Sequence, residues 1–133
     1  MPVRELDAMR QLADASRGAG LLHALKPFRA SGGTVIDRGH VLSIECGEGI
    51  AALIARSGSL RQWGRRRWAR RSAVAVVSEA VAADLVSVIS AAASAHLAGI
   101  AVLGSSPNEL EHGIELADRH GLFLIAMPNG GAS

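Results

Sequence analysis

Aromatic residues are scarce in this sequence: they make up 3% of the 133 residues, and tyrosine is absent. Any hydrophobic core must therefore be packed from aliphatic side chains, and the hydrophobic fraction of 49% is nearly all alanine, valine, leucine and isoleucine. That fraction is well above the level of disordered chains, so a core can form. Alanine-rich helices and strands rich in valine or isoleucine favour a layered α/β domain.

Cysteine and long hydrophobic runs are almost missing as well. The single cysteine, Cys46, excludes an internal disulfide bond, which fits a reducing compartment. No apolar run reaches the ~18 residues that a membrane-spanning helix needs, and no hydrophobic signal segment follows Met1. We therefore expect a cytoplasmic protein, and peripheral attachment to the inner membrane remains an open alternative.

Glycine, proline and serine divide the chain into the elements of one domain spanning residues 1–133. A helix is expected from Val3 to about Leu25, interrupted at Gly18 and Gly20. Strands are expected at 34–36 and 41–44, joined by a tight turn with Gly39 at positive φ. A helix at 50–56 and a strand at 73–77 follow. The remaining expected elements are a helix from Ser78 and Glu79 to about His96, a strand at 99–103, a helix starting at Ser106–Glu109, and a strand at 122–126. The β-α-β-α-β order after residue 73 predicts a mostly parallel sheet with right-handed crossovers.

Positive charge is concentrated in one segment, although the net charge is only +2. Six of the fourteen basic residues lie between Arg61 and Arg71, interleaved with Trp63 and Trp68. This pattern suits an anionic membrane surface or a nucleic acid held by phosphate contacts and stacking. A solvated segment whose tryptophans pack on the domain is the third interpretation. The candidate ligand-binding residues here are Arg65, Arg66, Arg67, Arg70 and Arg71.

Three stretches of the sequence resemble one enzyme family. Residues 34–49 read Thr-Val-Ile-Asp-Arg-Gly-His-Val-Leu-Ser-Ile-Glu-Cys-Gly-Glu-Gly, residues 97–102 read Leu-Ala-Gly-Ile-Ala-Val, and residues 117–124 read Ala-Asp-Arg-His-Gly-Leu-Phe-Leu. In order and spacing they are similar to the hairpin, the L-A-G-I-A-V strand and the A-D-x-x-G-L-F segment of LpxI-type UDP-2,3-diacylglucosamine pyrophosphatases. The resemblance covers about residues 26–126 and concerns the C-terminal domain of that family.

The resemblance implies a role in lipid A biosynthesis. Members of the family hydrolyse the pyrophosphate of UDP-2,3-diacylglucosamine in a metal-dependent reaction, and they hold this substrate between two domains. The present chain corresponds to the second domain alone, so we expect a UDP-sugar lipid ligand and either a separate first domain or a homo-oligomer, most simply a twofold dimer.

The sequence departs from the family where acidic residues are expected. Ile50-Ala51 replaces the family's Thr-Asp, Arg29–Gly32 replaces Asp-Ile-Gly-Gln, and the polar loop K-P-x-Q-D with R-x-D-L-P has no counterpart in Ser78–Val86. Pyrophosphate hydrolysis needs a cation such as Mg²⁺ held by carboxylates. The losses predict too few ligands for that cation, although Mg²⁺ remains the expected ion if the chain is active.

Few candidate site residues remain. The resemblance and the Gly-Glu-Gly turn before a helix make Glu48 a candidate catalytic residue, because helix N-termini bind phosphate; a turn residue that favours the helix dipole is the plain alternative. Asp84 is the second catalytic candidate or else a helix cap. The remaining candidates are Glu45, Gly47 and Gly49 as ligand-binding residues, with Glu79 as a further carboxylate.

Three functions stay open at this point. The leading hypothesis is a divergent binding or interaction module that has lost full catalysis. The second is a metal-dependent pyrophosphatase completed by a partner chain or a homodimer. The third is a binder of anionic membrane surfaces or nucleic acid through residues 61–71, with nucleic acid the less favoured partner.

Overall fold

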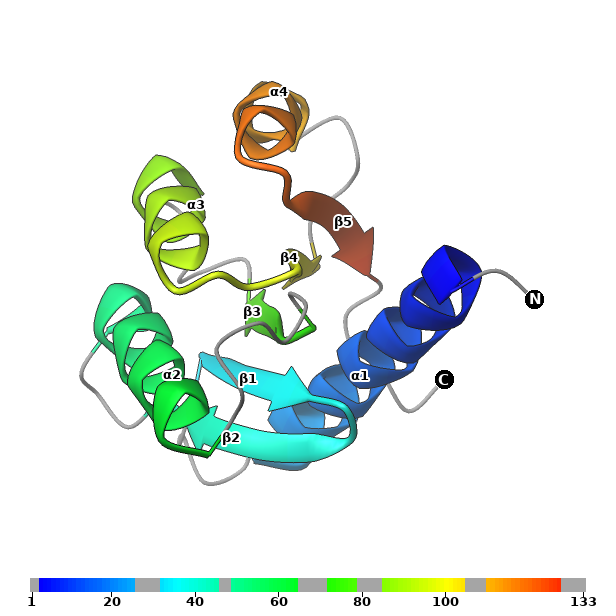
Figure 1. Cartoon of the computed structure of the whole chain (residues 1–133), viewed down its shortest axis with the longest axis vertical. Coiled ribbons are helices and arrows are strands. Elements are labelled where there is room, and N and C mark those ends of the chain that lie inside the picture. The colour runs from blue at the N-terminus through cyan, green and yellow to red at the C-terminus, as the bar shows by residue number, and fades with distance from the viewer. Residues whose placement is uncertain are drawn as a thin grey trace.

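The computed structural model describes residues 3–25, 32–45, 49–64, 72–78, 85–104 and 110–127. They form a five-stranded sheet covered by helices (Figure 1). The elements are α1 Val3–Leu25, β1 Gly33–Asp37, β2 His40–Ile44, α2 Ile50–Gly64, β3 Val74–Ser78, α3 Leu85–Ser94, β4 Gly99–Leu103, α4 Glu111–Arg119 and β5 Phe123–Met127.

The sheet is mixed, and this corrects the prediction of a mostly parallel sheet. Its strand order is β2-β1-β3-β4-β5; β3, β4 and β5 are parallel, whereas β1 is antiparallel to both β2 and β3. The α/β class is confirmed, and the predicted order is matched in part: β3, α3, β4, α4 and β5 follow it, but α2 runs on to Gly64, beyond its predicted end near residue 56. The sheet is mixed because β1 lies between β2 and β3 and pairs antiparallel with both; Thr34 of β1, for example, pairs with Val76 of β3. The chain crosses over β1 through α2 to pass from β2 to β3.

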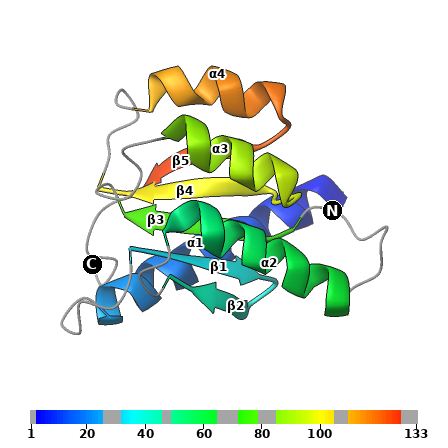
Figure 2. The ribbon, with the colours of Figure 1, turned by 90° about the vertical axis from the view of Figure 1, so that its left-hand side faces the viewer.

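Helices cover the two faces of the sheet unequally. Figure 2 shows α2, α3 and α4 side by side on one face and α1 on the other. The first face carries the larger hydrophobic cluster, which includes Leu53, Ile89 and Ile100. The second cluster joins Ala15, Ala19 and Leu22 of α1 to β3 and β4. Both clusters are aliphatic among their fully buried residues, as the shortage of aromatic residues predicts.

The first helix differs from its prediction at its glycines. α1 runs without interruption from Val3 to Leu25, through Gly18 and Gly20. Gly18 is buried against the sheet, and a Cβ added there would lie 2.5 Å from Cγ2 of Val76. Glycine at this position therefore allows the helix backbone to approach β3, instead of ending the helix.

Two predicted helix starts need comment. Ser78 does not begin a helix, because it is the last residue of β3, where it pairs with Leu103 and donates its N–H to the carbonyl of Gly32. The predicted helix start at Ser106–Glu109 lies outside the described residues. In the described part α4 begins at Glu111, and its cap, Leu110, makes no side-chain capping bond.

The turn between β1 and β2 has positive φ at both central residues. Gly39 has φ of +84°, as predicted, and Arg38 has φ of +50°. Two-residue hairpin turns of type I′ require positive φ at both positions, which favours Asn-Gly. Arg38 therefore has a backbone conformation that residues with a Cβ rarely adopt.

We expect Arg38→Asn to raise the free energy of unfolding by about 0.5–1 kcal/mol, because asparagine tolerates this conformation. The substitution removes only a partly exposed contact of 3.5 Å between Arg38 Nε and Asp37 Oδ1, and such contacts contribute little. Urea denaturation followed by circular dichroism measures the change. Arg38→Ala is the control, since it loses the same contact without relieving the backbone, and equal stability of the two variants would contradict the argument.

Candidate ligand-binding site at the carboxyl edge of the sheet

The carboxyl ends of the three parallel strands meet at one edge of the sheet. Ser78, Leu103 and Met127 end β3, β4 and β5, and Gly104 N–H donates to the carbonyl of Met127 at 2.9 Å. Because β1 is antiparallel to β3, its first residue, Gly33, lies at this same edge opposite Val77. In open α/β sheets, ligands bind outside the carboxyl ends of the strands, so this edge is the candidate site.

Three helices begin at this edge. α2 starts at Ile50, whose side chain packs on Gly33, and Leu53 N–H donates to the carbonyl of Gly49 at 3.1 Å. α3 and α4 begin where the chain returns from β3 and β4, at Leu85 and Glu111. Helix N-termini carry partial positive charge. Neither α2 nor α3 has an acidic residue in its first turn to offset it, whereas α4 has Glu111 there. The edge is therefore suited to an anionic group.

Two described carboxylates lie near this edge: Glu111 in the first turn of α4 is exposed, whereas Glu45 is buried. It is 9% exposed, its N–H donates to the carbonyl of Gly33 at 2.9 Å, and its Oε1 accepts the N–H of Gly32 at 3.5 Å. These contacts tie the end of β2 to the start of β1. The geometry gives Glu45 a structural role in addition to its predicted role in ligand binding.

The other predicted residues of this site fall mostly outside the described part. Gly47, Glu48 and Asp84, together with Glu79, lie outside it. Gly49, the residue after Glu48, has φ of +94° and precedes α2. Leu85, the residue after Asp84, begins α3. The described neighbours of both predicted catalytic residues thus lie at the carboxyl edge.

The described neighbours of the arginine and tryptophan segment lie toward the opposite edge. Arg65, Arg66, Arg67, Arg70 and Arg71 lie outside the described residues. Ser72, which follows them, donates its hydroxyl to Asp37 Oδ1 at 2.5 Å, at the far end of β1 from Gly33. Gly58 of α2 packs on Ala95, which follows α3, so α2 also runs toward that far edge. The predicted ligand-binding residues therefore belong to two regions of the sequence whose described neighbours lie at opposite ends of the sheet.

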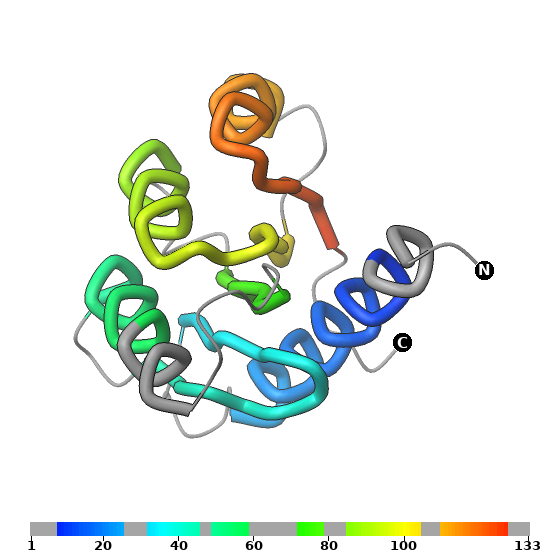
Figure 3. The backbone as a smooth tube through the Cα atoms, in the orientation of Figure 1, coloured from blue at the N-terminus to red at the C-terminus, as the bar shows by residue number. Residues whose placement is uncertain are grey.

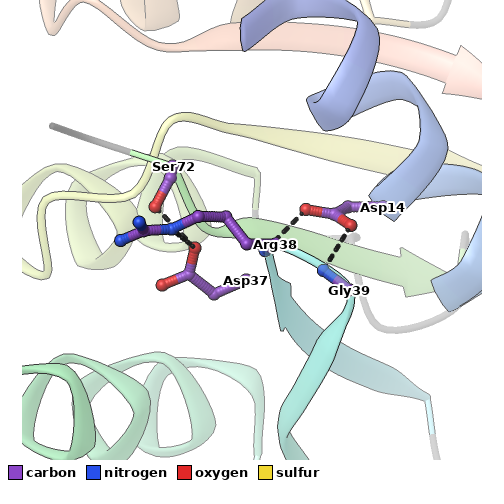
Figure 4. A network of polar contacts seen from close by, with 5 residues as sticks. All are labelled: Asp14, Asp37, Arg38, Gly39 and Ser72. Atoms are coloured by element: carbon purple, nitrogen blue, oxygen red, sulfur yellow. Dashed lines mark hydrogen bonds and ion pairs between the residues drawn. The ribbon is translucent and has the colours of Figure 1, made fainter. Parts of the chain in front are cut away.

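Two buried carboxylates were missed by the sequence reasoning. Asp14 and Asp37 are each 4% exposed. The two oxygens of Asp14 accept the N–H groups of Arg38 and Gly39 at 2.9 and 2.8 Å, so α1 caps the hairpin turn (Figure 4). Figure 3 shows this turn alongside α1. Asp14 lies in an alanine-rich helix with no motif around it, so only long-range packing reveals its partners.

A second buried polar group lies between β2 and α2. Ser57 donates its hydroxyl to the carbonyl of Leu53 at 3.0 Å, so Ser43 must donate to Ser57 across the 2.5 Å between their hydroxyl oxygens. Thr34 in turn donates to the carbonyl of Ser43 at 2.7 Å. No buried side-chain polar atom in the described part of the chain lacks a partner. These hydroxyls hold the hairpin against α2 and are not poised for chemistry.

The described ranges contain no group of three or more histidine, cysteine, aspartate or glutamate side chains that could hold a metal ion. Glu45 alone does not supply the several oxygen ligands that Mg²⁺ takes from protein and substrate. The other candidate carboxylates, Glu48, Glu79 and Asp84, lie outside the described ranges. Among the residues that the structure describes, no helix has the length and apolar character to cross a membrane.

Comparison with known proteins adds no assignment. No protein-family model matches the chain, and no curated protein matches it. The resemblance to LpxI-type enzymes therefore rests on the three sequence stretches described above and stays a prediction.

Proposed function

We propose that this domain binds a phosphate-bearing ligand of the UDP-diacylglucosamine class at the carboxyl edge of its sheet, without full catalysis. The observation that supports this most directly is the start of α2 and α3 at that edge, with no acid in the first turn of either helix. Backbone N–H groups at helix starts bind phosphate oxygens. The three stretches similar to LpxI-type enzymes supply the ligand class and the link to lipid A biosynthesis.

The proposal assigns binding and not hydrolysis because of the acidic residues. The family's acids at three places are replaced, notably by Ile50-Ala51. Both of these residues lie in the first turn of α2, where Ile50 is buried against Gly33. Aliphatic side chains there leave the helix N–H groups available to an anion, while they offer no ligand to a cation.

Thermal unfolding with UDP-2,3-diacylglucosamine, with and without Mg²⁺, tests the proposal. A ligand present at 100 times its dissociation constant stabilises the folded chain by about 2.7 kcal/mol, which raises the melting temperature by roughly 10 °C for a domain of this size. UMP and inorganic pyrophosphate serve as partial ligands. We expect a shift with the full ligand, little dependence on Mg²⁺, and no UMP released in the same tubes.

Two variants locate the binding. Ala51→Asp, at an exposed position in the first turn of α2, places a negative charge at the proposed anion site. Without Mg²⁺ it should lower the affinity for the ligand at least tenfold and so reduce the shift in melting temperature. Arg66→Ala, in the segment whose described neighbours lie at the opposite edge, should leave it unchanged. If Arg66→Ala lost the shift and Ala51→Asp kept it, the proposal would be overturned in favour of binding by the arginine segment. Release of UMP would show that the chain hydrolyses the ligand, which would overturn the proposal of binding without catalysis.

A further inference from the structure

The two edge strands of the sheet, β2 and β5, differ in how they are protected from pairing with another strand. At one edge, β2 carries a register shift opposite Val35 and Ile36, and it exposes His40. At the other edge, β5 reads Phe-Leu-Ile-Ala-Met, with no charge, no proline and no register shift against β4. Natural proteins usually protect an edge strand with charges, bulges or proline. β5 has none of these devices.

β5 is also less buried than its sequence suggests. All five of its residues are only partly buried, whereas all five residues of the neighbouring β4 are buried. Phe123, Ile125 and Met127 pack partly on the α1 face, and Leu124 and Ala126 pack on the opposite face. A wholly apolar edge strand that is only partly buried offers both apolar surface and main-chain groups to another strand.

The hydrogen bonds to β4 identify which groups face outward. Phe123 N–H donates to the carbonyl of Ala98, and the carbonyl of Met127 accepts from Gly104. Because main-chain groups alternate in direction along a strand, Phe123, Ile125 and Met127 bond to β4. The N–H and C=O groups of Leu124 and Ala126 therefore point away from it. Within the described ranges no strand pairs with this outer edge.

We propose that two copies of this chain associate by antiparallel pairing of their β5 strands about a twofold axis at Ile125. In this register Leu124 and Ala126 of one copy exchange main-chain hydrogen bonds with Ala126 and Leu124 of the other. The apolar faces also match, because Phe123 lies opposite Met127 of the second copy. The two sheets become one continuous sheet, with α1 of both copies on the same face. A self-complementary apolar strand selects a second copy over a dissimilar peptide.

A cross-link at the axis tests this register. Ile125 faces its own counterpart as a non-hydrogen-bonded pair, with Cα atoms about 4.5 Å apart, within the range that a disulfide bridges. In a Cys46→Ser background, Ile125→Cys should form a disulfide-linked dimer on mild oxidation. Met127→Cys is the matched control, because it would face Phe123 and lie far from its own counterpart. Cross-linking of both variants alike, or of neither, would overturn the pairing.

Sedimentation over a range of concentrations provides the second measurement. The unmodified chain should reach about twice the monomer mass. Ala126→Pro removes an outward N–H without removing a bond to β4, and it should abolish the dimer while leaving the circular dichroism spectrum unchanged. A chain that is monomeric at every concentration would overturn the proposal. This is the result expected if a different protein occupies the β5 edge. So would a dimer that persists unchanged in Ala126→Pro.

Discussion

Replacement of Asp14 by alanine is expected to lower the free energy of unfolding by about 2–4 kcal/mol, because a hydrogen bond to a charged group contributes about 1.5–3 kcal/mol. Asp14 is 4% exposed, and its two oxygens accept the N–H groups of Arg38 and Gly39. Alanine would leave both N–H groups without the acceptor that joins the turn to α1. Urea denaturation followed by circular dichroism measures the loss.

Asp14→Asn is the matched control. Asparagine keeps one acceptor oxygen and places an amide donor opposite the second N–H, so we expect roughly half of the loss seen with alanine. Ser16, on the exposed side of the same helix, offers a second comparison: Ser16→Ala should change stability by no more than about 0.5 kcal/mol. If Asp14→Ala were as mild as Ser16→Ala, the capping role of Asp14 would be wrong.

Opposite effects are expected from alanine at the two glycines of α1. Gly18→Ala should destabilise the domain by about 1–2 kcal/mol, because overpacking costs about 1–3 kcal/mol and the gain in helix propensity offsets only part of it. The added Cβ would lie 2.5 Å from Cγ2 and 2.9 Å from Cβ of Val76, and the latter atom is fixed to the β3 backbone. Gly20→Ala meets nothing within 4 Å and should stabilise by about 0.5–1 kcal/mol.

A double-mutant cycle assigns the Gly18 effect to its contact. In a Val76→Ala background the space beside Gly18 is larger, so Gly18→Ala should lose most of its cost. Urea denaturation of the four chains gives the coupling energy. Equal costs of Gly18→Ala with and without Val76 would show that the contact with β3 is not the cause.

The candidate site could be located only in part from sequence. Glu45 and Gly49 follow a predicted strand and precede a predicted helix, so their place at the end of the sheet follows from local pattern. The burial of Glu45 against Gly32 could not be read in the same way, since these residues are joined only through the pairing of β1 and β2. Ser72 and Asp37 likewise meet across 35 positions of sequence.

The sequence by itself determined the kinds of element and the chemistry of the core. Hydrophobic periodicity, turn residues and the shortage of aromatics depend on neighbours within a few positions. The strands and helices of the described ranges, the aliphatic core and the positive φ of Gly39 were therefore predictable. Tertiary structure decided that β1 lies between β2 and β3, that Gly18 packs on Val76, and that Asp14 caps the hairpin. These features depend on contacts between residues far apart in sequence, which strand and helix patterns do not encode.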